Sequence, residues 1–228
     1  MRPALPIFAI VIGILAAACG TTTDSGSQTE YSGIIFNDSA GSQLCGALAE
    51  SYPPQCGEPI VALGDLRLDD VVALQSAEAT SWTDYQAGVA GDEADGALTN
   101  VVLTDPVYAN TSAGFILRVA DLGITSGQAI VLPIDVRNTT DQDATLTFTS
   151  GQRVELTLSQ DGEEVYRWSS TASFIQSVEE VVLPAGATFG RTLITSPVDL
   201  PAGTYTAQAW ITAIESSDLV VEWTTTVR

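Results

Sequence analysis

Two cysteines in the folded part of the chain limit what thiol chemistry can occur there. Cys45 and Cys56 stand close together in the sequence, and the only other cysteine is Cys19. In an exported protein such a pair is normally oxidised, and a bridge over a loop of this size stabilises a fold by roughly 3 kcal/mol. The alternative is a site with two thiolate ligands, but the chain offers no histidine or further cysteine to complete a zinc shell. We therefore expect a structural Cys45–Cys56 disulfide, with no metal and no cofactor.

The composition also excludes most kinds of catalytic site. The chain of 228 residues carries 8 cations, all of them arginine, and no histidine. The commonest general base and the usual Schiff-base nucleophile are therefore absent, and a Ser-His-Asp or Cys-His hydrolase cannot be built. Adjacent carboxylates such as Glu179 and Glu180 would point to opposite faces of a strand, so they would not converge on a glycoside. The sequence predicts a protein that is not an enzyme.

The charge balance of the chain argues against a nucleic-acid partner. With 28 acidic residues the formal net charge is -20, and the sequence pI is near 4.1. Binding to nucleic acid requires a dense basic surface that releases counterions from phosphates, so no nucleic-acid partner is expected.

Residues 1–18 have the features of a lipoprotein signal peptide. Arg2 supplies a positive charge, and an apolar stretch from Ile7 to Ala17 follows that is too short for a comfortable membrane span of about 20 residues. The string Leu-Ala-Ala-Ala-Cys-Gly that ends this region resembles a bacterial lipobox, although its leucine is one position further from the cysteine than usual. Cys19 would then carry the lipid, leaving the protein exported and anchored to the bacterial membrane, facing outward. An ordinary secretory peptide with a chance cysteine is the alternative.

The lipidated cysteine would begin a flexible tether, residues 19–32, which is small and polar. A first folded part, residues 33–109, shows no sustained helical period. We expect one or two helical turns over 42–51 and a hairpin turn at Asp95-Gly96. Strands are expected over 59–68, 81–89 and 97–103. This predicts a small β module pinned by the disulfide, for which a small barrel is one suitable form.

Residues 112–228 alternate apolar and polar side chains more clearly. In the last run, Leu219, Val221, Trp223, Thr225 and Val227 share one face. Asp161-Gly162 predicts a further hairpin turn, and Pro133 predicts an edge position or a strand start. Short strands with one apolar face each predict two packed sheets. The expected fold class is therefore all-β, with a C-terminal Ig-like β-sandwich.

Four motifs follow one another in this half: Leu132-Pro133-Ile134-Asp135-Val136-Arg137-Asn138, Phe148-Thr149-Ser150-Gly151-Gln152, Tyr166-Arg167-Trp168-Ser169 and Pro201-Ala202-Gly203-Thr204-Tyr205. In this order they resemble the intracellular proteinase inhibitor (BsuPI) family. The family pattern has an Asn that closes a first strand, a Phe-x-Ser-Gly-Gln turn, a Trp-Arg-Trp-Ser strand and a Pro-Gly-x-Tyr string near the end. Tyr166 stands where the first Trp of that strand often lies. The matching positions, each of which also has a structural explanation, are Asn138, Ser150, Gly151, Trp168, Phe174, Gly203 and Tyr205.

The resemblance implies a β-sandwich that serves as a binding module and inhibits subtilisin-type serine proteinases. Such a protein would present a rigid loop to the proteinase cleft, and the candidate loops are 169–174 and 141–143. The alternative is a non-inhibitory structural or scaffolding lipoprotein of the cell envelope that engages polysaccharide or a partner protein. The first folded part is similar to a module of actinobacterial exported lipoproteins, through Leu44-Cys45 and the string from Ser51 to Gly57. That likeness implies no activity.

Overall fold

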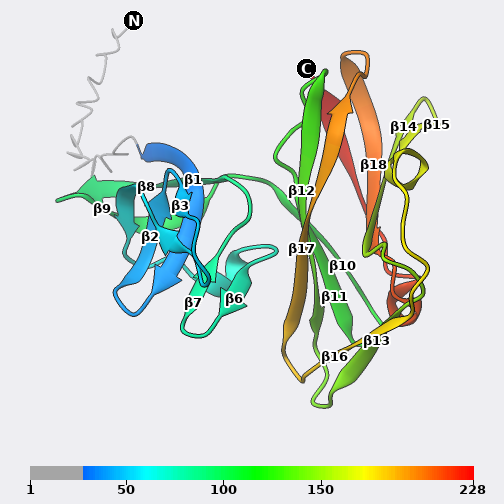
Figure 1. Ribbon diagram of the computed structural model, residues 1–228. Coiled ribbons are helices and arrows are strands. Elements are labelled where there is room, and N and C mark those ends of the chain that lie inside the picture. The colour runs from blue at the N-terminus through cyan, green and yellow to red at the C-terminus, as the bar shows by residue number, and fades with distance from the viewer. Residues whose placement is uncertain (1–27) are drawn as a thin grey trace, which may run out of the picture.

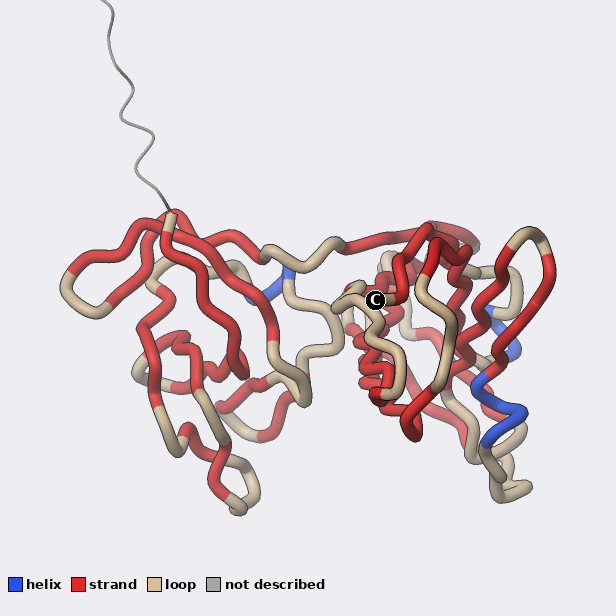
Figure 2. The backbone as a smooth tube through the Cα atoms, turned by 90° about the horizontal axis from the view of Figure 1, so that it is seen from above, coloured by secondary structure: helices blue, strands red, loops and turns tan. Residues whose placement is uncertain are grey.

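The computed structural model describes residues 28–228, and the protein is all-β over this range (Figures 1 and 2). The predicted signal peptide, Cys19 and most of the predicted tether lie outside the described residues. The helical elements in this range are three short 3-10 turns, η1 (Leu68–Asp70), η2 (Trp168–Thr171) and η3 (Ile214–Ser216). None of the helices between residues 28 and 228 has the length and apolar character needed to cross a membrane.

The N-terminal module is a closed five-stranded barrel. Its sheet runs in the order β1-β2-β5-β9-β8 and returns to β1, and β5 pairs with β9 in parallel. The strands are β1 (Thr29–Asp38), β2 (Gly41–Cys45), β5 (Pro59–Leu63), β8 (Ala87–Ala94) and β9 (Ala97–Leu103). The barrel that the sequence suggested is therefore confirmed.

Strand β1 closes the barrel because its two halves have different partners. Residues 29–33 pair with β8, whereas residues 34–38 pair with β2. At the change of partner, a Cβ on Gly33 would lie 2.8 Å from the carbonyl oxygen of Cys45, so glycine permits the close approach. The barrel begins four residues earlier than expected, since residues 29–32 lie in β1 rather than in a tether.

The disulfide joins Cys45 at the end of β2 to Cys56, as the sequence predicts. The helical turns expected over 42–51 are wrong, because this segment forms part of β2 and the short strand β3 (Leu48–Ala49). β3 pairs with β4 (Gln55–Cys56). The backbone N–H and C=O groups of β2 are hydrogen-bonded to β1 and β5, whereas in a helix they would be bonded within the segment. A second hairpin, β6 (Gln75–Ala77) and β7 (Thr80–Trp82), extends from β1.

The C-terminal module is a β-sandwich. One sheet has the order β10-β11-β12-β17 and the other β15-β14-β18-β19, while β13 and β16 form a separate pair. The first sheet contains β10 (Val107–Ser112), β11 (Phe115–Ala120), β12 (Gln128–Asn138) and β17 (Thr188–Val198). The second contains β14 (Val154–Gln160), β15 (Glu163–Arg167), β18 (Gly203–Ile211) and β19 (Val221–Val227). The pair is β13 (Ala144–Phe148) with β16 (Glu179–Leu183).

The apolar faces of both large sheets form one core. In β19, Val221, Trp223, Thr225 and Val227 are buried while the residues between them are exposed, as the alternation predicted. The sandwich begins earlier than residue 112, because β10 already pairs with β11 from Val107 onward. Pro133 is not at an edge: β12 lies between β11 and β17, and Pro133 sits one residue beyond the β11 ladder, where its missing N–H is tolerated.

Candidate functional site

Four of the seven family-motif residues meet at the base of one exposed segment. Residues 172–178, which we call the strap, leave η2 and run without regular secondary structure along the outside of the sandwich to β16 (Figure 1). Ser150, Gly151, Trp168 and Phe174 lie at or beside its upstream end. The predicted loop 169–174 is therefore η2 followed by the first half of the strap.

The upstream end of the strap is fixed by main-chain and aromatic contacts. Gly151 donates its backbone N–H to the carbonyl oxygen of Ile175 at 2.8 Å. A Cβ on Gly151 would lie 2.9 Å from Cγ1 of Ile175, so the turn can approach the strap only because the residue is glycine. The Phe174 ring packs edge-on against Trp168, with the ring centroids 5.1 Å apart.

Trp168 is itself fixed to the second sheet. The neighbouring Ser169 donates its backbone N–H to the carboxylate of Glu155 at 3.1 Å. Glu155 is only 3% exposed, and its other oxygen lies 3.6 Å from the guanidinium of Arg167. The start of η2 is thus joined to β14 by a buried, charged hydrogen bond.

The downstream end of the strap is fixed by Arg153. Its guanidinium forms an ion pair with Glu179, the first residue of β16, and also donates to the carbonyl oxygen of Ser150. The same guanidinium lies over the Phe148 ring, 4.4 Å from its centroid, and Phe148 is the strand partner of Glu179. Arg153 thereby joins the Ser150-Gly151 turn to the point where the strap ends.

Two large aliphatic side chains of the strap are exposed to solvent. Ile175 and Val178 are 75% and 70% exposed, the two highest values among the exposed large aliphatic side chains. Large apolar side chains presented on a backbone fixed at both ends are typical of recognition segments, because little conformational freedom remains to be lost on binding.

The other motif residues have structural roles away from the strap. Asn138 is fully buried, and its amide donates to the carbonyl oxygens of Gln142 and Leu183. It therefore shapes the connection that contains the second predicted loop, 141–143. Tyr205 donates its hydroxyl to the carbonyl oxygen of Pro201 at 2.8 Å, a contact like a tyrosine corner. Gly203 begins β18 beside the side chain of Gln160.

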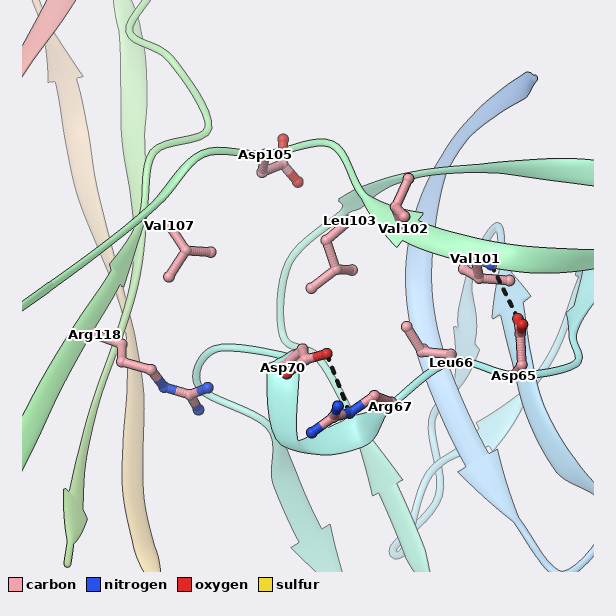
Figure 3. A pocket seen from close by; sticks show the side chains of 10 residues that line it. All are labelled: Asp65, Leu66, Arg67, Asp70, Val101, Val102, Leu103, Asp105, Val107 and Arg118. Carbon is pink, nitrogen blue, oxygen red and sulfur yellow. Dashed lines mark hydrogen bonds and ion pairs between the residues drawn. The ribbon is translucent and has the colours of Figure 1, made fainter. Parts of the chain in front are cut away.

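A groove of about 510 Å³ lies between the two modules (Figure 3). Val101, Val102 and Leu103 of β9 line its barrel side, and Val107 and Arg118 line its sandwich side. The Asp65 carboxylate accepts the backbone N–H groups of Asn100 and Val101, which occupies part of this face of β9. The cationic and acidic side chains in the groove are largely paired with protein atoms.

A second hollow of about 510 Å³ lies on the barrel beside the disulfide. Tyr52, which is 85% exposed, stands at this site together with Asp38, Gln43 and Gln55. The loop that carries Tyr52 is tied by the Ser51 hydroxyl, which donates to the carbonyl oxygen of Pro53. The site combines an open aromatic face with amide and carboxylate groups.

Shifted pKa values in the described residues have structural causes. Burial raises the pKa of Tyr85, whose hydroxyl donates to the carbonyl oxygen of Val72 inside the barrel. Burial also raises the pKa of Asp105, although the backbone N–H of Gly88 opposes this by donating to the carboxylate. Within residues 28–228 no three His, Cys, Asp or Glu side chains come together as a metal site.

The C-terminal module is thus a two-sheet β domain with an exposed segment that is fixed to the outside of the sandwich. Residues 118–216 match the family model described as intracellular proteinase inhibitor, BsuPI. The C-terminal half of the chain therefore carries a match to this family model, as its motifs indicated. The match begins in β11 and ends in η3, so β10 and β19 complete the sandwich outside it.

No curated protein sequence matches the chain. Among solved structures, a β-glucosidase of Listeria innocua bound to glucose is 14% identical, with a TM-score of 0.30 over 55% of this chain and 16% of the enzyme. A β-glucosidase of Erythrobacter marinus is 12% identical, with a TM-score of 0.31 over 58% of this chain and 17% of the enzyme. The chain thus spans about a sixth of their length, and TM-scores of this size define no shared fold or activity.

The sequence motifs identified residues at the base of the strap, but not the exposed residues of the strap or the arginine that fixes its downstream end. Ile175, Val178 and Arg153 were not singled out, and the loop was expected to end at Phe174. One signal was available: an aliphatic residue on each side of Gln176-Ser177, directly before the acidic pair at 179–180. The partners of Arg153 lie on separate strands, so its role depends on tertiary structure.

Proposed function

We propose that this protein is an exported lipoprotein, anchored through Cys19, whose BsuPI domain binds and inhibits a subtilisin-type serine proteinase through the strap. The main support is the strap itself, an extended and exposed segment fixed at Ile175 and at Glu179. Proteinases bind extended chains in their clefts, and a segment that is already ordered loses less entropy on binding. The BsuPI match supports a proteinase as the partner.

Titration of the purified full-length protein, in mild detergent, against subtilisin tests the inhibitory part. We expect progressive loss of peptide hydrolysis, because the strap occupies the cleft. Gly151→Ala should weaken inhibition about tenfold, since the new methyl group would displace Ile175. The matched control is Gly57→Ala in the barrel, where the nearest atom to the added Cβ is 3.5 Å away. Undiminished hydrolysis at micromolar protein would refute the inhibitory function.

The anchor is tested separately in the producing cell. Cys19→Ser should move the protein from the membrane fraction to the soluble exported fraction, because no thiol remains to accept the lipid. Mass spectrometry of the N-terminal peptide should find an acylated cysteine in the unmodified protein. A protein that stays with the membrane after Cys19→Ser would show that another attachment holds it.

The hollow at Tyr52 supports a second candidate function, a scaffolding role in which the barrel binds envelope polysaccharide. An exposed aromatic ring can stack on a sugar face, while Asp38, Gln43 and Gln55 could hydrogen-bond to its hydroxyl groups. Co-sedimentation with purified cell-wall polysaccharide should then fall for Tyr52→Ala, with Gly57→Ala as the control. Equal sedimentation of both variants would remove this function.

A further inference from the structure

We propose that Val178 is the residue of the strap that enters the primary specificity pocket of the bound proteinase. The partner would therefore have an apolar pocket that accepts a β-branched side chain. This inference rests on the proposed inhibitory function and adds to it the contact residue and the character of the pocket that receives it. It follows from comparing the two exposed aliphatic residues of the strap.

Ile175 is the more exposed of the two, but its backbone is already engaged. A residue bound in a substrate-like manner must direct its carbonyl oxygen to the oxyanion-hole donors of the proteinase. The Ile175 carbonyl oxygen accepts the Gly151 N–H at 2.8 Å, so it points toward the sandwich. Cγ1 of Ile175 also contacts the Gly151 turn. Ile175 is thus an anchor of the strap.

Val178 meets the requirements that Ile175 does not. Its side chain is 70% exposed. Among the described residues, the loop hydrogen bonds include none from the main chain of Gln176, Ser177 or Val178. These three residues lie between the Ile175 anchor and the Glu179 anchor, and β pairing to β13 begins only at Glu179. Their backbone can therefore pair with the edge of a proteinase cleft as an added strand.

The charges around Val178 determine which pocket is compatible. Neither lysine nor arginine occurs between Trp168 and Gly190. A trypsin-like pocket has an aspartate at its base and needs a cation from its ligand, which this segment cannot supply. Glu179 and Glu180 follow Val178 directly, and Glu180 is exposed, so an acidic pocket would also be repelled. An apolar pocket remains the compatible class.

The test compares the full-length protein with Val178→Arg against subtilisin and trypsin. Subtilisin has an apolar pocket, whereas trypsin has the acidic one. We expect the unmodified protein to inhibit subtilisin alone. Val178→Arg should lose on the order of 100-fold in subtilisin inhibition, because a cation is poorly accepted there, and should gain inhibition of trypsin. Val182→Arg, at an exposed position of β16 that is 62% exposed, is the matched control and should leave both values unchanged.

The possible outcomes test the role of Val178 separately from the inhibitory function. If Val178→Arg inhibits subtilisin as strongly as the unmodified protein does, Val178 does not enter the pocket, and the inhibitory function stands without this inference. If the unmodified protein inhibits neither enzyme, the proposed function itself fails and the inference fails with it. Circular dichroism of each variant would confirm that the sandwich is folded, so that a loss can be assigned to the contact.

Discussion

The guanidinium of Arg118 forms two hydrogen bonds to the carboxylate of Asp135, with N···O distances of 2.9 and 2.8 Å. The two residues face each other on β11 and β12, and Asp135 is fully buried. One Asp135 oxygen also accepts the backbone N–H of Ala73 from the barrel module, while Arg118 donates to the carbonyl oxygens of Asp69 and Val71. A single ion pair of the sandwich thus holds a segment of the other module.

Asp135→Asn should lower the free energy of unfolding by about 3 kcal/mol, because it leaves the mostly buried Arg118 without its counter-charge. Urea denaturation would measure the change. Arg67→Ala is the control, since the Arg67–Asp70 pair is exposed and its loss should cost less than about 1 kcal/mol. Equal effects of the two variants would contradict the role of the buried pair.

Gly190→Ala tests the contact between the modules at a second point. A Cβ on Gly190 in β17 would lie 2.8 Å from Cα of Ala73, so the barrel segment must move away. We expect a loss of about 1–3 kcal/mol in thermal or urea unfolding, as for other insertions into a packed contact. Faster proteolysis near residue 73 should accompany it. Unchanged stability would show that the two modules separate without cost.

Reduction of the Cys45–Cys56 bridge should destabilise the barrel by roughly 3 kcal/mol, since it releases the loop between β2 and β4. The sandwich contains no cysteine, so its own unfolding should not respond to a reductant. Hydrogen exchange, followed for each module before and after reduction, would separate the two. Equal loss of protection in β14 and β2 would contradict this prediction.

The pH dependence of stability should have a contribution from Glu215. Its carboxylate accepts the backbone N–H and the hydroxyl of Thr147, both at 2.7 Å. Partial burial acts to raise the pKa of Glu215, but these hydrogen bonds outweigh it and the pKa is lowered. A lowered carboxyl pKa stabilises the fold above its unfolded value of about 4.3, and the contribution is lost as the pH falls through the folded value.

Glu215→Gln should therefore be less stable than the unmodified protein at pH 7, by about 0.5 kcal/mol at this exposed position. The difference should shrink as the pH falls below about 4. Burial raises the pKa of Asp105, so this residue changes the pH dependence of stability in the opposite direction. Its contribution is the same in both proteins and therefore cancels in the difference between them. A difference that stays constant from pH 6 to pH 3 would rule out a titrating contact.

Much of the fold follows from local patterns in the sequence. The Asp95-Gly96 and Asp161-Gly162 turns form as expected, because all four residues adopt positive φ values, which these residue types tolerate. The alternation in β19 reflects one buried face. The helix expected over 42–51 failed because its partners, β1 and β5, lie elsewhere in the chain and override a weak local preference.

For the strap, the sequence predicted only the residues at its base. Ser150-Gly151 and Trp168 stand out as motif residues, and they do support the strap. The exposure of Val178 results from the distance between two anchors, and no local pattern encodes that distance. The same holds for Arg118, which pairs with a residue 17 positions away and also reaches backbone carbonyls 47 and 49 positions away.

The way in which β1 closes the barrel has a mechanical consequence. Thr29, the first residue of this strand, pairs with Gly91 of β8, whereas Leu103, where the chain leaves the barrel for the next module, pairs with Val89 of the same strand. Force carried between Thr29 and Leu103 would therefore cross β8 near one end of the sheet, and the β1–β8 hydrogen bonds nearest Thr29 would bear it first. The first half of β1 should then detach before the half that β2 holds.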